Sequence, residues 1–179
     1  MRETVTLTGM VLLSAPSGDF DRRLVLLTRE RGKITAFSHG ARKPGNPLMA
    51  ASRPFCFGNF NLYEGRNAYN LQSAQITNYF DGLSTDMEAA CYGSYFLEMA
   101  DYYGRENIDA TETLRLLYQS LRALLKPSVP NRLVKPVYEL KLMEINGEYR
   151  ELPLGRLNDS TLYAWQYVLA APVESLYTF

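Results

Sequence analysis

The chain has 179 residues, 46% hydrophobic and 21% charged, which is ordinary for a globular protein, so disorder is not expected. Basic and acidic residues cancel at nineteen each, and no stretch approaches the ~18 uninterrupted apolar residues of a membrane span. The zero net charge hides an asymmetry, because residues 1–80 carry ten cations and five anions, whereas the remainder carries nine and fourteen. The first half, at about +5, is therefore the half suited to a polyanionic partner.

Residues 4–80 predict β structure throughout. Turn residues recur at short intervals, and no helical period is visible between them. A long first strand followed by four others suits a small closed barrel, and the five-stranded oligonucleotide-binding (OB) barrel is the natural candidate. The predicted strands are Val5–Leu13, ended by Pro16-Ser-Gly18, the hairpin strands Leu24–Thr28 and Ile34–Ser38, and, after a Gly/Pro loop, Phe55–Tyr63 and Ala68–Tyr79.

At Asp81 the pattern changes to helical spacing. Two capping boxes, Thr85 with Glu88 and Asp109 with Glu112, mark helix starts. The fold class predicted is therefore α+β, with an OB barrel over residues 1–80 and an α-helical domain over 81–179. The apolar chain end suggests that this helical domain is truncated at its C-terminus. The predicted helices are 87–103, 111–126, 132–146 and 159–170.

The second hairpin strand carries an unusual set of side chains. Because strand side chains alternate, Ile34 and Ala36 are expected on one face and Lys33, Phe37 and His39 on the other. A cation, a ring and an imidazole together are unusual in a core. They suit a nucleic-acid strand, since cations contact phosphates and rings stack on bases.

Further cations extend this basic track into the loops. Solvated turn charges are the ordinary explanation for each of them, but most lie in one half of the chain with few acids to offset them. Arg22 and Arg23 are weaker candidates, because Asp19 and Asp21 could neutralise them. Phe37 and Tyr69 are candidate stacking rings that would also fit a barrel core, and His39 could equally be an ordinary rim histidine. The candidate DNA-binding residues are Arg22, Arg23, Lys33, Phe37, His39, Arg42, Lys43, Arg53 and Arg66.

No pattern supports catalysis. The chain has no phosphate-binding glycine loop with a lysine, no HExxH and no GxSxG. His39 is its only histidine and has no cysteine near it in the sequence, so neither a metal site nor a catalytic triad can be assembled around it. Cys56 and Cys91 lack CxxC spacing and are expected to be reduced core thiols. We therefore predict no enzymatic activity, no metal, no cofactor, no membrane association and a cytoplasmic location.

Three segments carry a family resemblance: Asp21–Lys43, Leu62-Tyr-Glu-Gly-Arg66 and Tyr138-Glu-Leu-Lys-Leu142. Together they resemble the RecO family of bacterial recombination and DNA-repair mediators, most strongly in Gly40-Ala-Arg-Lys43. The resemblance implies binding to single- and double-stranded DNA, annealing of complementary strands and work with RecR at the nucleoid. It also implies contact with the C-terminal tail of single-strand-binding protein, to help load RecA.

The chain departs from the family pattern in two ways. Many members carry a four-cysteine zinc motif after the Glu-Leu-Lys helix, whereas residues 149–156 here contain no cysteine, which again predicts no zinc. The family is also longer at its C-terminus, which leaves open whether the site for the partner tail is complete. Two other functions remain open, a protein–protein adaptor with an OB barrel and an RNA-binding OB protein of translation. Oligomeric state, stoichiometry with RecR and a shared surface for single and double strands also remain open.

Overall fold

The computed structural model describes residues 4–148. Contacts between residues divide this part of the chain into two compact units. The barrel unit contains residues 4–80 together with 100–114, and the helical unit contains 81–99 and 115–148. Two boundaries between the units thus fall inside helices, and each unit is described by itself below.

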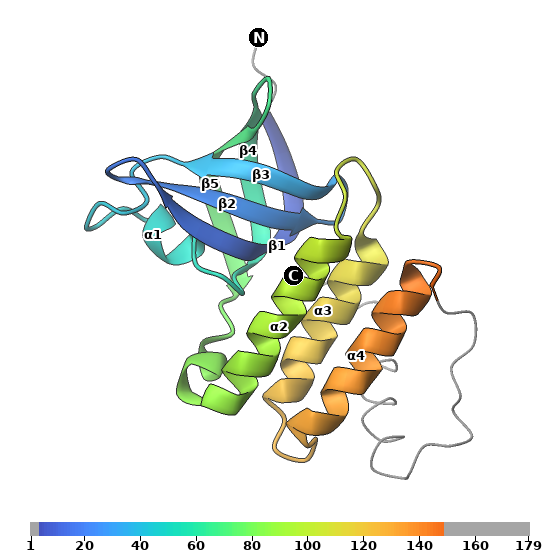
Figure 1. Ribbon diagram of the computed structural model, residues 1–179. Coiled ribbons are helices and arrows are strands. Elements are labelled where there is room, and N and C mark those ends of the chain that lie inside the picture. The colour runs from blue at the N-terminus through green and yellow to red at the C-terminus, as the bar shows by residue number, and fades with distance from the viewer. Residues whose placement is uncertain (1–3, 149–179) are drawn as a thin grey trace. The chain divides into compact units, whose positions relative to one another are not determined.

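Five strands of the barrel unit form a closed barrel in the order β1–β2–β3–β5–β4 (Figure 1). Neighbouring strands are antiparallel except β3 and β5, whose parallel pairing closes the barrel. The predicted α+β class, with a five-stranded OB-type barrel followed by helices, is confirmed. The strands are β1 Thr4–Ser17, β2 Asp21–Thr28, β3 Gly32–Ser38, β4 Phe57–Glu64 and β5 Tyr69–Asn78.

The long strand β1 is shared between two neighbours. Its first half pairs with β4 and its second half with β2, and a bulge between Val11 and Leu13 lies in the second pairing. A bulge increases local twist and bends the strand, which allows one strand to turn the corner of a small barrel. The β1–β2 turn and the end of β3 consequently lie at the same end of the barrel.

Alternation along the strands fills the barrel interior. In β3, Ile34 and Ala36 are buried, whereas Lys33, Thr35 and Phe37 on the opposite face are partly exposed. This confirms the two faces predicted for Lys33 and Phe37. The buried set is apolar, and each large member stabilises the fold by about 1.5–3 kcal/mol. The barrel core comprises Leu7, Val11, Leu24, Leu26, Ile34, Ala36, Cys56, Phe60, Leu62, Tyr69 and Leu71.

A short helix, α1 (Leu48–Ala51), lies in the connection between β3 and β4, where only a loop was predicted. Its four residues are too few to show a helical period, and Pro44, Gly45 and Pro47 before it are typical of loops. The helix contacts β5 and buries Ala51. It therefore anchors the end of the long β3–β4 connection on the barrel.

The segment of residues 104–110 pairs with the β2–β3 hairpin. The Lys33 N–H donates to the Arg105 carbonyl (3.0 Å), and the Asn107 N–H donates to the Arg31 carbonyl (2.9 Å). Gly32 lies at this contact with φ +65°, and a Cβ there would lie 2.2 Å from the Arg105 carbonyl oxygen. Only glycine satisfies both the left-handed backbone and the close approach.

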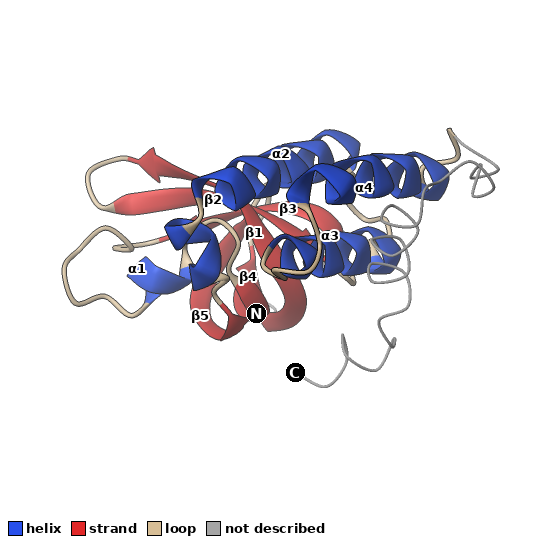
Figure 2. Cartoon of the chain, turned by 90° about the horizontal axis from the view of Figure 1, so that it is seen from below, coloured by secondary structure: helices blue, strands red, loops and turns tan. Residues whose placement is uncertain are grey.

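Three long helices follow a 3-10 turn, η1 (Asp81–Thr85), and lie side by side (Figures 1 and 2). The capping box predicted at Thr85 is wrong by one residue. The Asp86 carboxylate accepts the Ala89 N–H (3.0 Å), whereas the Thr85 hydroxyl donates to the Gly82 carbonyl in the turn. The helix predicted over 159–170 lies outside the described residues. The helices are α2 Met87–Tyr103, α3 Thr111–Leu124 and α4 Asn131–Ile145.

The core of the helical unit is centred on an aromatic pair. The rings of Phe96 and Tyr138 stack with centroids 4.2 Å apart, and the Tyr138 hydroxyl donates to the Phe96 carbonyl (2.8 Å). Both cysteines are free thiols, but only Cys56 is buried. The prediction of a core thiol is wrong for Cys91, which lies on the exposed side of α2. No helix within residues 4–148 is long and apolar enough to cross a membrane.

Candidate nucleic-acid interface

Two loops meet at one end of the barrel, the β1–β2 turn and the loop that follows β3. The Arg42 N–H donates to the Phe20 carbonyl (2.8 Å), and the Arg42 guanidinium donates to the Gly18 carbonyl (3.3 Å). The Lys43 ammonium lies 5.1 Å from the centroid of the Phe20 ring, within cation–π range. We call Phe20, His39, Arg42 and Lys43 the basic loop cluster.

The backbone of the basic loop cluster is fixed by Asp21, the first residue of β2. One carboxylate oxygen accepts the Gly40 N–H (2.8 Å), and the other lies 2.7 Å from Nδ1 of His39. Ala41, between Gly40 and the two cations, is fully buried, and the Lys43 N–H donates to the Gly40 carbonyl (2.9 Å). The two cations therefore project from an ordered loop, which lowers the entropy cost of binding a ligand there.

His39 is held between two oxygen acceptors. Its Nδ1 faces Asp21, and its Nε2 lies 3.1 Å from Oδ1 of Asn70 on β5. The hydrogen bond to Asp21, followed by the one to Asn70, raises the pKa of His39. The Gly40 N–H and then His39 lower the pKa of Asp21. Both shifts favour an imidazolium paired with a carboxylate, so His39 anchors the loop and adds little unbalanced charge.

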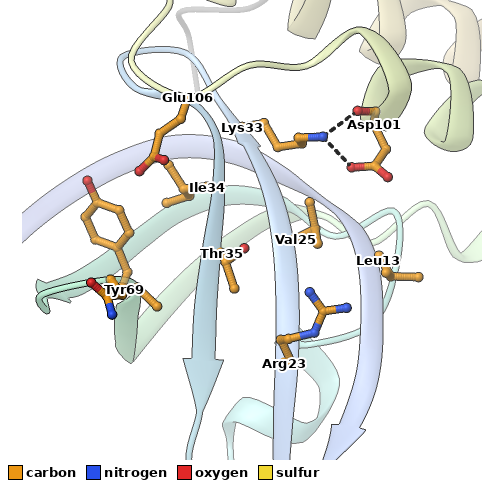
Figure 3. A pocket seen from close by; sticks show the side chains of 11 residues that line it. Leu13, Arg23, Val25, Lys33, Ile34, Thr35, Tyr69, Asp101 and Glu106 are labelled. Carbon is orange, nitrogen blue, oxygen red and sulfur yellow. Dashed lines mark hydrogen bonds and ion pairs between the residues drawn. The ribbon is translucent and has the colours of Figure 1, made fainter.

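A second basic region lies on the outer face of β1, β2 and β3. Arg23 pairs across the strands with Phe37, so both side chains share this face. A pocket of about 380 Å³ lies on this face (Figure 3). Arg23 lines one end of it and Lys33 the other, with Val25 and Thr35 between them. Because Arg23 is exposed at one end of this pocket, its side chain is accessible to a ligand on the barrel's outer face.

Lys33 lies at the opposite end of this pocket and is already paired. Its ammonium donates to the Asp101 carbonyl (2.7 Å) and lies 3.2 Å from the Asp101 carboxylate (Figure 3). Glu106 also lines the pocket on this side. The positive charge of Lys33 is therefore offset by acidic groups of the segment 100–114.

The remaining predicted cations are Arg22, Arg53 and Arg66. Arg22 donates to the Ser14 hydroxyl (3.0 Å), while its buried Nε finds no hydrogen-bond partner within residues 4–148. Arg53 follows α1, with its guanidinium 5.8 Å from the centroid of the Tyr79 ring, and Arg66 is exposed in the β4–β5 turn. Of the nine candidates, the structure brings together His39, Arg42 and Lys43 at one end of the barrel. It places Arg23, Lys33 and Phe37 on one outer face, and Arg22, Arg53 and Arg66 at other positions.

The two aromatic rings noted in the sequence have different surroundings. Tyr69 is only 5% exposed and belongs to the barrel core, as its alternative interpretation as a core residue predicts, whereas Phe37 is partly exposed. Phe20, which the sequence analysis passed over, is 51% exposed in the β1–β2 turn. The available signal was a large apolar residue between Asp19 and Asp21, two positions after Gly18, where turn residues are normally polar. In the part of the chain that the structure describes, no group of three or more acidic, Cys or His side chains is arranged to hold a metal.

Comparison with known families matches both halves of the chain to models of one protein family. Residues 1–80 match the model described as Recombination protein O N terminal, and residues 84–152 match Recombination protein O C terminal. The chain belongs to the RecO family. The resemblance proposed from the sequence is thereby confirmed.

Several RecO proteins align over most of this chain. It is 31% identical over 139 residues to the DNA repair protein RecO of Alkaliphilus metalliredigens and 33% identical over 146 residues to that of Desulforudis audaxviator. It is 28% identical over 144 residues to the DNA repair protein RecO of Bacillus subtilis. These alignments cover 78%, 80% and 80% of the chain, but only 56%, 57% and 56% of the respective relatives. The chain thus spans little more than half the length of these RecO proteins.

Proposed function

We propose that this chain is a non-enzymatic DNA-binding protein of recombinational DNA repair, and that its barrel holds DNA through the basic loop cluster. The observation that supports this most is the placement of Arg42 and Lys43 on a loop whose backbone is fixed to the barrel. Their charges would neutralise phosphates and release condensed counterions, which favours binding to any sequence. Arg23, exposed on the adjoining outer face, would extend the path of the strand.

Annealing would follow from the same physics without an active site. Two strands whose phosphates are partly neutralised repel each other less, and complementary bases can then pair. Family membership further supports binding to both single- and double-stranded DNA, and work with RecR and the tail of single-strand-binding protein to load RecA. We propose these partners, and an association with the nucleoid, for the full-length context of the family.

A salt titration with matched variants tests the proposal. The variant Arg42→Ala/Lys43→Ala removes two charges from the basic loop cluster. The control, Arg122→Ala/Arg132→Ala, removes two exposed charges from the helical unit. Binding of fluorescently labelled single-stranded DNA is followed by anisotropy over a tenfold range of salt concentration.

For the first variant we expect weaker binding and a salt slope lower by ~0.7 for each phosphate that is no longer neutralised, equally for strands of different sequence. The control should retain the slope of the unaltered protein. An unchanged slope in Arg42→Ala/Lys43→Ala, or an equal reduction in the control, would show that DNA is held elsewhere. A parallel titration with RNA of the same sequence distinguishes the alternative of an RNA-binding protein, which would bind the RNA more tightly.

A further inference from the structure

Phe20 is the ring of the basic loop cluster, and its exposure calls for an explanation. It is 51% exposed and is the last residue of a three-residue turn between the paired residues Ser17 and Asp21. Single apolar residues on a surface are common, and Leu13 and Met49 are exposed to a similar extent. Phe20 differs from them because it contacts two cationic residues of the neighbouring loop. The Arg42 N–H donates to its carbonyl, and the Lys43 ammonium lies over its ring.

We propose that Phe20 is a platform on which an unpaired base stacks, and that the basic loop cluster thereby prefers single-stranded over duplex DNA. The inference rests on the proposed function and adds to it a residue and a preference for unpaired bases. Every base presents a π-face, so stacking on a phenyl ring adds affinity without reading sequence. In a duplex the bases already stack on one another, so the ring gains nothing there.

The geometry around Phe20 supports this role. The Arg42 N–H donates to the Phe20 carbonyl (2.8 Å) and the Arg42 guanidinium to the Gly18 carbonyl (3.3 Å), so the turn and the cationic loop are linked by two hydrogen bonds. With the Lys43 ammonium 5.1 Å from the ring centroid, a phosphate bound by Lys43 would lie within one nucleotide of a base on the ring. A base and its neighbouring phosphate can thus be held at the same time.

Three ligands of equal length separate stacking from charge: a single-stranded oligonucleotide, the same backbone without bases, and a duplex. We expect Phe20→Ala to weaken binding of the single strand by about tenfold and to leave the abasic strand and the duplex unchanged. Phe20→Tyr should retain affinity for the single strand. Met49→Ala is the matched control, because it removes an exposed apolar side chain elsewhere in the barrel unit and should change none of the three.

A spectroscopic readout tests stacking directly. The sequence contains a single tryptophan, Trp165, so Phe20→Trp adds one new fluorophore at the turn. We expect the single strand, but not the abasic strand, to quench the added fluorescence. No quenching by the single strand overturns the inference.

The outcomes also separate this inference from the proposed function. If the unaltered protein binds all three ligands with a salt slope, and Phe20→Ala weakens either none or all three equally, the stacking role is refuted and DNA binding stands. If the unaltered protein binds none of them, both the proposed function and the stacking role are refuted. Thermal unfolding of each variant confirms that a change in affinity is not a loss of fold.

Discussion

The Lys33 ammonium donates to the main-chain carbonyl of Asp101 at 2.7 Å and lies 3.2 Å from the carboxylate of the same residue. Asp101 is in the last turn of α2, where carbonyl groups lack a partner within the helix. A cation at that position donates a hydrogen bond to one of these carbonyls and interacts favourably with the negative end of the helix dipole. Lys33 thus performs a structural task that its place in a basic stretch of sequence did not reveal.

We therefore expect Lys33→Met to reduce stability more than DNA affinity. The free energy of unfolding should fall by about 0.5–1 kcal/mol, because the pair is partly exposed and screened. Urea unfolding measures this decrease, and Asp101→Asn in a double-mutant cycle separates the ion pair from the carbonyl interaction. Arg23→Met, on the same outer face, is the control expected to lower affinity with little change in stability. A large decrease in DNA affinity in Lys33→Met with unchanged stability would contradict the assignment.

The His39–Asp21 pair predicts a pH dependence of stability. The pKa of His39 is raised above 6.5, so its contribution to stability is complete below pH 6.5 and is lost as the pH rises through the folded-state pKa. The pKa of Asp21 is lowered below 3.8, so its contribution is complete above pH 3.8 and is lost as the pH falls through the folded-state value. The pair therefore stabilises the loop fully between about pH 3.8 and 6.5.

Urea unfolding of the unaltered protein and of His39→Gln at pH values about one unit below and two units above the ordinary histidine pKa measures this dependence. The free energy of unfolding of the unaltered protein should exceed that of His39→Gln by more at the lower pH than at the higher pH. In an Asp21→Asn background, the effect of His39→Gln should be the same at both pH values. The change in the free energy of unfolding with pH will be small, since the His39 side chain is 64% exposed. An advantage that grows towards the higher pH would refute the pairing.

Gly32→Ala should be among the more damaging single substitutions in the barrel unit. Its φ of +65° costs an L-residue about 1–2 kcal/mol, and the added methyl group would also meet the Arg105 carbonyl. Gly18→Ala is a matched control, because Gly18 has φ +60° but no atom within 4 Å of the added Cβ. Chemical denaturation should show a decrease of about 1–2 kcal/mol for Gly18→Ala and a clearly larger decrease for Gly32→Ala. Equal decreases would mean that the segment 105–108 does not approach Gly32 this closely.

Removing the Tyr138 hydroxyl tests the core of the helical unit. Tyr138→Phe keeps the ring stacked on Phe96 and should cost about 1 kcal/mol for the buried hydrogen bond. Tyr138→Ala also removes the ring and should cost about 3–5 kcal/mol. Burial raises the pKa of Tyr138 far above its usual value, so this tyrosine should not ionise before the protein unfolds in an alkaline absorbance titration. Ionisation near the ordinary tyrosine pKa of about 10 in the folded state would contradict this packing.

Local patterns predicted most of the fold. Alternation along β3 and the helical spacing of α2, whose bounds Met87–Tyr103 match the prediction, depend on neighbours in sequence. The four-residue helix α1 was missed because one turn is too short to show a period, and the cap was placed at Thr85 because Thr85 and Asp86 are both good capping residues.

The candidate site was less predictable, because its electrostatics depend on interactions between distant residues. Lys33 and Asp101 are 68 positions apart, and His39 meets Asn70 across 31. No local pattern indicates that Lys33 is neutralised by Asp101 or that the His39 imidazole is hydrogen-bonded to Asn70. Arg42 and Lys43, in contrast, lie in a polar Gly/Pro loop whose exposure is readable from sequence. Phe20 was missed because a lone aromatic residue in a turn gives no periodic signal.

The pairing of the hairpin turn with residues 105–110 affects how a gene fragment of this protein would behave. A polypeptide that stopped at residue 80 would include all five strands found within residues 4–148. The Lys33 N–H and the Arg31 carbonyl would nevertheless lose the main-chain partners that Arg105 and Asn107 provide. These groups would then form an open edge able to recruit another chain. We expect such a fragment to self-associate, whereas one that continued through the α2–α3 connection would carry the missing edge with it.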